Sequence, residues 1–409
     1  MGEPTLTLNH PITRRAALQG IAAWIGTARF AHSAEPSTGG RFIEKQQTGA
    51  EIWQVTTEEF DQSDIYGEVP YCSRDSRHFV YARRNPALKT NRTEFMLVEL
   101  GTWNQQRLDT GISISGCAIS HNGLFYYLKQ ADDGSTDLMR ADLENGLVTA
   151  VYRLPPGLAI RSLGTVTTDG RYYAGGTMTE PGWKMFDITL LDLQEGEHRI
   201  LDRDPFILNP HPQFEPGDGR MLMIQHNRGG KYSPDGQLER LVGPEGATLY
   251  VLSVPEGRRT ELAVGTPHTT ACTGHEAWIG TTGEMLLSVS ASGEFRPEKG
   301  NLLAVRAGQA PRVVARGYRF NHVGASRCGR IFSADDWQPP YKIVIGSTQA
   351  ERAAVICESK TSPTRSQNTH PHPYVTPDLK WVIFNSNRAG SDHIYAARIP
   401  DELMANLLR

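Results

Sequence analysis

The sequence predicts an all-β protein, a seven-bladed β-propeller, and three observations support this fold class. First, a turn followed by an apolar, strand-like run occurs seven times along the chain. Second, most copies continue with another strand-like run, so each unit of roughly 40 to 50 residues contains hairpins. Third, these runs show a period of two, and no long helical pattern interrupts them. Radial repetition of small antiparallel sheets, which leaves only short protected edges, is the architecture that accounts for all three. The second runs begin at Phe95, Phe186, Ala247 and His393.

The repeated turn gives the blades their register along the chain. Its seven copies are marked by Asp75, Asn122, Asp169, Asp218, Thr282, Cys328 and Asp378. Successive markers are 47, 47, 49, 64, 46 and 50 residues apart, so the repeat is regular except at one long step. That step contains residues 227–244, rich in Gly and charge, which we interpret as a surface loop inserted into the fourth blade. A β-sandwich with loosely similar hairpins is the alternative fold.

The first 34 residues differ in character from the predicted propeller, which we place at residues 42–409. Arg14 and Arg15 precede an apolar run from Ala16 to Phe30, and small residues follow that run. This pattern resembles a twin-arginine export signal, which is an address and not an element of the fold. We therefore expect an exported protein located in the periplasm. An ordinary N-terminal extension is the alternative.

Composition narrows the range of partners. The chain has 42 Lys and Arg against 45 Asp and Glu, so it lacks the basic field that dominates nonspecific nucleic-acid binding. No apolar stretch is long enough to suggest a membrane-spanning helix, so no membrane partner is expected after signal removal. The five cysteines are an odd number without a CxxC pair and predict no disulfide framework. An anionic ligand would need local cations or a metal, and the oligomeric state stays open.

The histidines fall at one position of the repeat. His211 and His275 precede the markers of blades four and five by seven residues, and His322 and His372 precede those of blades six and seven by six. Equivalent positions of neighbouring blades converge near one end of the central channel of a propeller. Four consecutive blades therefore predict a shared site, whereas a lone histidine would be interpreted as structural.

Additional side chains extend this predicted site. His370 lies two residues before His372, and alternation within a strand places both on one face. Gln367 comes shortly before them, and His226 directly follows the apolar run of blade four. Neutral imidazole is the commonest transition-metal ligand, and several imidazoles with a carbonyl oxygen suit Mn, Fe or Zn. The pattern predicts a divalent metal centre.

These residues resemble a known family. The cluster Gln367, His370-Pro-His372 and the following Thr376-Pro-Asp turn is similar to the oligogalacturonate lyases, seven-bladed propellers with a manganese site. The segment Gly274-His-Glu-Ala-Trp278 is similar to the family's His-Glu-Phe-Trp segment. Further matches are Asn321-His322 at the start of blade six, and His211-Pro followed fifteen residues later by His226. The resemblance extends over blades four to seven, and earlier only the repeat is shared.

The resemblance implies a site and a reaction. It implies that His322, Gln367, His370 and His372 hold a divalent metal, manganese in the family, and that His275 abstracts the proton. The implied reaction is β-elimination of uronic-acid oligosaccharides, most closely oligogalacturonates from pectin, giving unsaturated uronate products. His226 and His211 are the alternative bases.

The chain departs from the family at one point of this site. Where the family places an arginine in the second strand of blade four, this chain has Ala247-Thr-Leu-Tyr. Arg228 and Arg240, both in the insertion, are the candidates to neutralise a substrate carboxylate. Their alternative role is as solvated loop charges. The sequence does not distinguish galacturonate from other uronates.

Two other functions stay open. A non-catalytic propeller that binds a glycan or a peptide is one, since the fold alone decides no function. A metalloenzyme of another kind, such as a hydrolase acting on a carbohydrate acid, is the second. It would need a carboxylate pair, or a carboxylate base beside a metal-bound water, and only Glu276 lies near the histidines in sequence.

Overall fold

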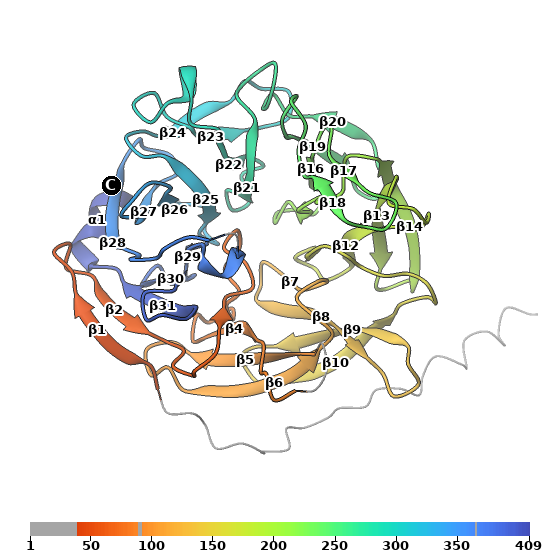
Figure 1. Cartoon of the computed structure of the whole chain (residues 1–409), viewed down its shortest axis with the longest axis horizontal. Helices are drawn as coiled ribbons and strands as arrows, with labels where there is room; N and C mark the ends of the chain where they lie inside the picture. The colour runs from red at the N-terminus through yellow and green to blue at the C-terminus, as the bar shows by residue number, and fades with distance from the viewer. Residues whose placement is uncertain (1–38, 89–91, 365) are drawn as a thin grey trace, which may run out of the picture.

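The structure is a computed structural model that describes residues 39–88, 92–364 and 366–409. Within these residues seven antiparallel sheets are arranged as a ring, which confirms the predicted seven-bladed β-propeller (Figure 1). The predicted export signal, residues 1–34, lies outside the described residues.

Each blade has four strands from one stretch of chain, except the last, and the first strands of neighbouring blades contact one another around the centre. Blades one to three consist of β3 (Gln62–Ser63), β4 (His78–Arg83), β5 (Thr93–Glu99) and β6 (Gln105–Gly111); β7 (Ala118–Ile119), β8 (Leu124–Gln130), β9 (Thr136–Asp142) and β10 (Val148–Arg153); and β11 (Gly164–Val166), β12 (Tyr172–Thr177), β13 (Phe186–Asp192) and β14 (Glu197–Asp204). Blades four to six consist of β15 (Gln213–Phe214), β16 (Met221–His226), β19 (Thr248–Ser253) and β20 (Arg259–Glu261); β21 (Cys272–Trp278), β22 (Met285–Val289), β23 (Leu302–Val305) and β24 (Arg312–Ala315); and β25 (Phe320–Ala325), β26 (Ile331–Asp336), β27 (Lys342–Ser347) and β28 (Ala353–Glu358).

The seventh blade closes the ring by joining the two ends of the described chain. Strands β29 (Tyr374–Val375), β30 (Trp381–Ser386) and β31 (His393–Arg398) are completed by β2 (Glu51–Gln54) and β1 (Arg41–Lys45). In Figure 1 the red N-terminal strands lie beside the blue C-terminal ones. The helix α1 (Asp401–Leu408) packs Met404 and Leu407 against the core of blades six and seven. The pairing of β2 with β31 covers the outer edge that β31 would otherwise expose.

The turn that repeats in the sequence is one backbone conformation used seven times. The residue after each marker has a positive φ, which is readily adopted by glycine and rarely by other residues. Five blades place a glycine there, while Ser76 (φ 58°) and Leu379 (φ 60°) adopt the same conformation. In blade one the Oδ1 atom of Asp75 accepts a hydrogen bond of 3.0 Å from the main-chain N–H of Arg77. Asp169, Asp218 and Asp378 accept the equivalent bond, so in four blades an Asx-type turn precedes the second strand.

The core is a set of layers between blades. Seven buried apolar clusters are found among the described residues, each drawn from two neighbouring blades. Because the second strands are covered on both faces, they are continuous apolar runs and not strict alternations: Phe79, Val80 and Tyr81 are all fully buried. The period of two is therefore weak in these strands.

The long step of the repeat forms a hairpin of its own. Strands β17 (Lys231–Tyr232) and β18 (Leu238–Arg240) pair with each other in a separate two-stranded sheet. In the chain they come between β16 and β19 of blade four, which pair directly with each other. The short helices η1 (Gly293–Phe295) and η2 (Gln367–Thr369) complete the secondary structure of the described residues. All five cysteines are free. In the described part of the chain, no helix has both the length and the apolar character needed to cross a bilayer.

Candidate metal centre

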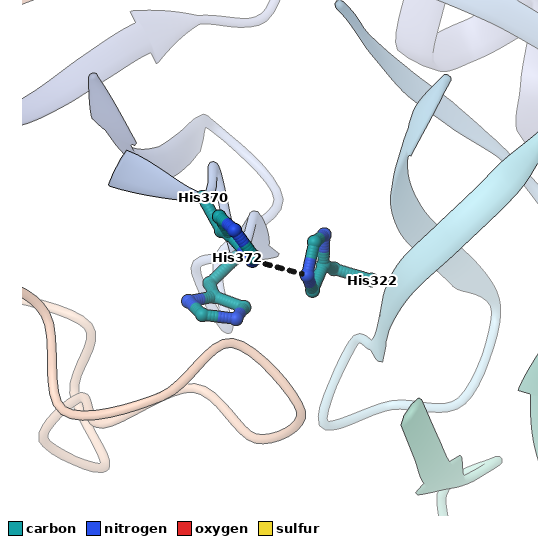
Figure 2. Close-up of side chains that lie close together, drawn as sticks. All are labelled: His322, His370 and His372. Atoms are coloured by element: carbon teal, nitrogen blue, oxygen red, sulfur yellow. Dashed lines mark hydrogen bonds between the residues drawn. The ribbon is translucent and has the colours of Figure 1, made fainter. Parts of the chain in front are cut away.

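Three histidines from blades six and seven converge at the centre of the ring. His322 lies on the inner strand β25, and His370 and His372 lie just before the inner strand β29. One ring nitrogen from each lies within 4.8 Å of the others, and Figure 2 shows the three rings facing one another. His322 and His372 are buried, while His370 is half-buried. The structure thus brings together three of the four predicted ligands.

Hydrogen bonds at the outer side of two rings direct their lone pairs inward. The Nε2–H of His370 donates to the carbonyl oxygen of Thr364 at 2.9 Å, so the Nδ1 atom of that ring carries the lone pair. Nδ1–H of His322 donates to Oδ2 of Asp335 at 2.6 Å, which leaves the lone pair on Nε2. These two lone-pair nitrogens are 3.2 Å apart, an arrangement that a cation or a proton between them would stabilise. A carbonyl and a carboxylate are the usual outer partners of metal-binding histidines.

The donor set fits a divalent metal. The Nε2 atom of His372 is buried and has no hydrogen-bond partner among the described residues. Burial, and then the neighbouring His370, hold the pKa of His322 well below its usual range, and burial likewise lowers the pKa of His372. Neutral imidazoles with free lone pairs are the form that binds first-row metals, at about 2.0 to 2.1 Å. The three converging ring nitrogens can therefore serve as ligands of a divalent metal.

The local backbone fixes where His372 points. The residue lies between Pro371 and Pro373 with φ 40°, a left-handed conformation that is costly for a non-glycine residue. The loop of blade one packs against it at Gly67, where an added Cβ would lie 2.3 Å from the carbonyl oxygen of His372. Only glycine permits this approach. The prolines and the glycine together hold the imidazole toward the ring centre.

His275, on the inner strand β21, lies beside the three histidines but outside their convergent group. Its ring centroid is 4.3 Å from that of His322 and 6.2 Å from that of His372. Its Nδ1 atom is 3.1 Å from the hydroxyl of Tyr66. Burial, followed by the charges of the other histidines, holds the pKa of His275 well below its usual range. The ring is thus neutral near pH 7, as a proton acceptor must be.

The fourth predicted ligand, Gln367, lies three residues before His370. It is an exposed residue of η2, and its main-chain oxygen accepts a 3.0 Å hydrogen bond from the main-chain N–H of His370. This bond shapes the turn that presents His370. Coordination by the Gln367 side chain stays a prediction.

The two alternative bases lie in blade four with carboxylate partners. His211 donates from Nδ1 to Oε1 of Glu68 at 3.1 Å, and its ring centroid is 5.6 Å from that of Tyr66. His226 ends β16, where Nε2 is 3.0 Å from Oδ1 of Asp204. His211 therefore borders the channel site through Tyr66, whereas His226 contacts the end of β14 in blade three.

Both candidate arginines bind main-chain carbonyls of the insertion and its surroundings. The guanidinium of Arg228 donates to the carbonyl oxygens of Glu245, Gly246 and Thr266. Arg240, on β18, donates to that of Gly229. In the described structure neither arginine has a hydrogen bond or ion pair with the channel histidines. All three guanidinium nitrogens of Arg228 donate to main-chain carbonyls, whereas Arg240 donates with Nε alone.

Sequence reasoning missed several residues of the site. Tyr66 comes from the irregular first segment of blade one, which shares no motif with the other inner strands. Asp335 lies on the second strand of blade six, and Trp337 packs at 4.9 Å, centroid to centroid, from both His322 and His370. The one signal for Asp335 was an acidic residue at the end of an apolar run, where a buried charge needs a partner.

Fold and site together define a seven-bladed β-propeller with a histidine-rich centre suited to a divalent metal. Within this class the chain is similar to oligogalacturonate lyases. It is 21% identical over 362 residues to the oligogalacturonate lyase of Dickeya dadantii strain 3937, covering 76% of this chain and 84% of that protein. No family model matches the sequence.

Solved structures agree with this likeness in fold. An oligogalacturonate lyase from Vibrio parahaemolyticus has a TM-score of 0.68 at 18% identity and covers 90% of this chain and 100% of its own. An oligogalacturonate lyase in complex with manganese has a TM-score of 0.68 at 17% identity, covering 91% and 100%. At these identities the likeness establishes the fold, and the chemistry has to be argued from the site.

Proposed function

We propose that this protein cleaves uronic-acid oligosaccharides by metal-dependent β-elimination, with oligogalacturonates as its substrates. The observation that carries the proposal is a neutral histidine, His275, placed beside three imidazoles whose ring nitrogens converge. Elimination next to a carboxylate needs these two parts: a cation that makes the adjacent carbon acidic and a base outside the cation's ligand sphere. The similarity to proteins named oligogalacturonate lyase supports the same reaction.

His322, His370 and His372 would hold the ion, which we propose to be manganese because a similar structure contains it. When bound, a divalent ion supplies Lewis acidity toward the uronate carboxylate and stabilises the charge that develops as the proton leaves. Among the described residues no arginine or lysine forms a hydrogen bond with the three histidines. The charge of a bound carboxylate is therefore left to the metal.

His275 would remove the proton at C5 of the uronate. If its Nδ1–H donates to the Tyr66 hydroxyl oxygen, the lone pair resides on Nε2, which can accept that proton. The C5 electron pair forms the new C4–C5 double bond while the C4–O glycosidic bond breaks, and the leaving oxygen takes up a proton. Tyr66 thereby selects the tautomer and orientation of the base, as carboxylates do in other histidine sites.

A hydrolase would use the same metal differently and needs an accessible carboxylate base. Glu276 is adjacent to His275 in sequence, but its side chain is fully buried. A fully buried carboxylate cannot contact a sugar or activate a bulk water. The structure thus favours elimination. Export to the periplasm is part of the proposal, supported by the sequence pattern of residues 1–34 alone.

The test is incubation of the manganese-loaded protein with oligogalacturonates while the ultraviolet absorbance of a conjugated carbon–carbon double bond is followed. We expect absorbance to rise with the loaded protein and to stay flat after chelation and dialysis. Loaded protein that binds the oligosaccharide without any rise in absorbance would instead indicate a glycan-binding propeller.

A further inference from the structure

A second group of metal-type ligands lies in the ring, apart from the three histidines. Glu68 of blade one, His211 of blade four and Glu276 of blade five each place one ligand atom within 4.8 Å of the others. Glu68 and Glu276 are buried and His211 is half-buried. Three elements far apart in sequence thus converge on one point.

The contacts inside this group leave one carboxylate without a partner. Nδ1 of His211 is 3.1 Å from Oε1 of Glu68 and 3.8 Å from Oε1 of Glu276. Oε2 of Glu68 accepts a hydrogen bond of 2.8 Å from Gln213. The side chain of Glu276 has no exposed surface, and neither of its carboxylate oxygens has a hydrogen-bond partner among the described residues. A buried carboxylate in this state is costly, so its oxygens require a proton or a cation.

Charge balance leads to the same requirement. In the described structure the only ion-pair partner of Glu68 and Glu276 is His211, and no Lys or Arg pairs with either. Burial opposes a charge on His211, but the two carboxylates outweigh it and raise its pKa to about 9. The group thus attracts positive charge strongly. One divalent cation, two carboxylates and one neutral imidazole sum to zero net charge.

The backbone of His211 is built like that of His372. It lies between Pro210 and Pro212 with φ 43°, against φ 40° for His372 between its own two prolines. Strained conformations of this kind persist where the surroundings hold them, often at functional positions. Nε2 of His211 is 2.9 Å from the side-chain amide of Asn209, which fixes the ring plane. Blades four and seven therefore aim an imidazole at the ring centre with the same local device.

We propose that Glu68, His211 and Glu276 form a second divalent-cation site, distinct from the three-histidine centre. Binding would release the Nδ1 proton of the doubly protonated His211 ring to solvent, and the neutral ring would keep its Nε2–H, which the Asn209 amide oxygen can accept after rotation of that amide. Two carboxylates and one imidazole suit a hard or borderline ion such as Mn²⁺. The proposal goes beyond the lyase function and does not rest on it.

The test is a metal count by elemental analysis after equilibrium dialysis of the full-length protein against Mn²⁺. We expect Glu276→Gln to lose one equivalent relative to the wild-type protein, His372→Ala to lose a different equivalent, and the double variant to lose both. Glu298→Gln, a highly exposed acidic position, is the matched control and should lose none. An unchanged count in Glu276→Gln would overturn the proposal and leave a proton as the partner of that carboxylate.

A thermal melt of each variant shows whether a lost metal equivalent reflects a lost site or a protein that has not folded. Gln is isosteric with Glu and is neutral like the protonated carboxyl that it replaces, so the metal-free Glu276→Gln variant should melt no lower than metal-free wild type. If that variant fails to fold, the metal count is repeated with Glu68→Gln, because the Glu68 side chain already has hydrogen-bond partners. The readout is also independent of activity: a protein that binds both equivalents but forms no unsaturated product would refute the proposed function and leave the second site standing.

Discussion

Replacing Asp335 by Asn is expected to weaken metal binding while the propeller stays folded. The carboxylate is fully buried and accepts two hydrogen bonds from His322, 2.6 Å from Nδ1 and 2.9 Å from the main-chain N–H. An amide can accept only with one of its two ends, so one charge-assisted bond is lost. Such a bond contributes about 1.5–3 kcal/mol. Because 1.4 kcal/mol corresponds to a factor of ten, the Kd for Mn²⁺ should rise roughly 10- to 100-fold.

Titration calorimetry of Mn²⁺ into the metal-free protein measures this change, analysed for the site that the His372→Ala variant lacks. Asp336→Asn is the matched control, since Asp336 is the next residue on β26 and accepts a 3.0 Å bond from the main-chain N–H of Arg319 instead. A wild-type Kd in Asp335→Asn, or an equal loss of affinity in the control, would show that the hydrogen bonds from His322 to Asp335 do not strengthen metal binding.

Three further changes test other parts of the account. His275→Asn should keep its metal content and lower kcat by about 10²- to 10⁴-fold, the usual share of a general base, and metal loss on elemental analysis would place the residue among the ligands. Burial raises the pKa of Asp64 to about 8, so the folded state keeps a proton that the unfolded chain releases near pH 4, and this group alone makes stability fall by about 1.4 kcal/mol per pH unit between about pH 5 and pH 8. In urea titrations of the metal-free protein the stability of Asp64→Asn should therefore have a slope against pH less negative than that of wild type by this amount, and equal slopes would contradict the assignment. Gly67→Ala places a Cβ 2.3 Å from the carbonyl oxygen of His372, so we expect a loss of about 1–3 kcal/mol or more together with weaker Mn²⁺ binding, and a wild-type melt and Kd would show that the loop adapts freely.

The fold could be predicted from the sequence because its unit is local. Each marker turn and the strand that follows it are contiguous, and the same backbone conformation is required seven times. Closure by β1 and β2 was not predicted, because β2 pairs with β31 from the other end of the chain and carries no repeat turn of its own.

Part of the candidate site followed from the same register. His275, His322 and His372 lie at equivalent positions of the repeat, and equivalent positions converge in a ring. Tyr66 and Asp335 could not be placed in this way, because one lies on an irregular segment and the other on a second strand whose neighbours face the core.

Charged residues were the weakest part of the sequence prediction. Arg228 and Arg240 have the right charge for an anionic substrate and stay candidates, but in the described structure all three guanidinium nitrogens of Arg228, and Nε of Arg240, donate to main-chain carbonyls. Hydrogen-bond competition of this kind depends on how a loop folds back on itself. No spacing in the sequence reports it. Conversely, Glu276 was noted only as a neighbour of His275, and its buried, unpartnered state became visible only in the structure.

The central claim is that this site eliminates and does not hydrolyse. Mass spectrometry of the products from an oligogalacturonate of one defined length, cut by the manganese-loaded protein, tests it most directly. Elimination adds no water, so the masses of the two fragments should sum to the mass of the substrate, with the unsaturated fragment one water lighter than its saturated counterpart. Fragments whose masses sum to substrate plus one water would contradict the account.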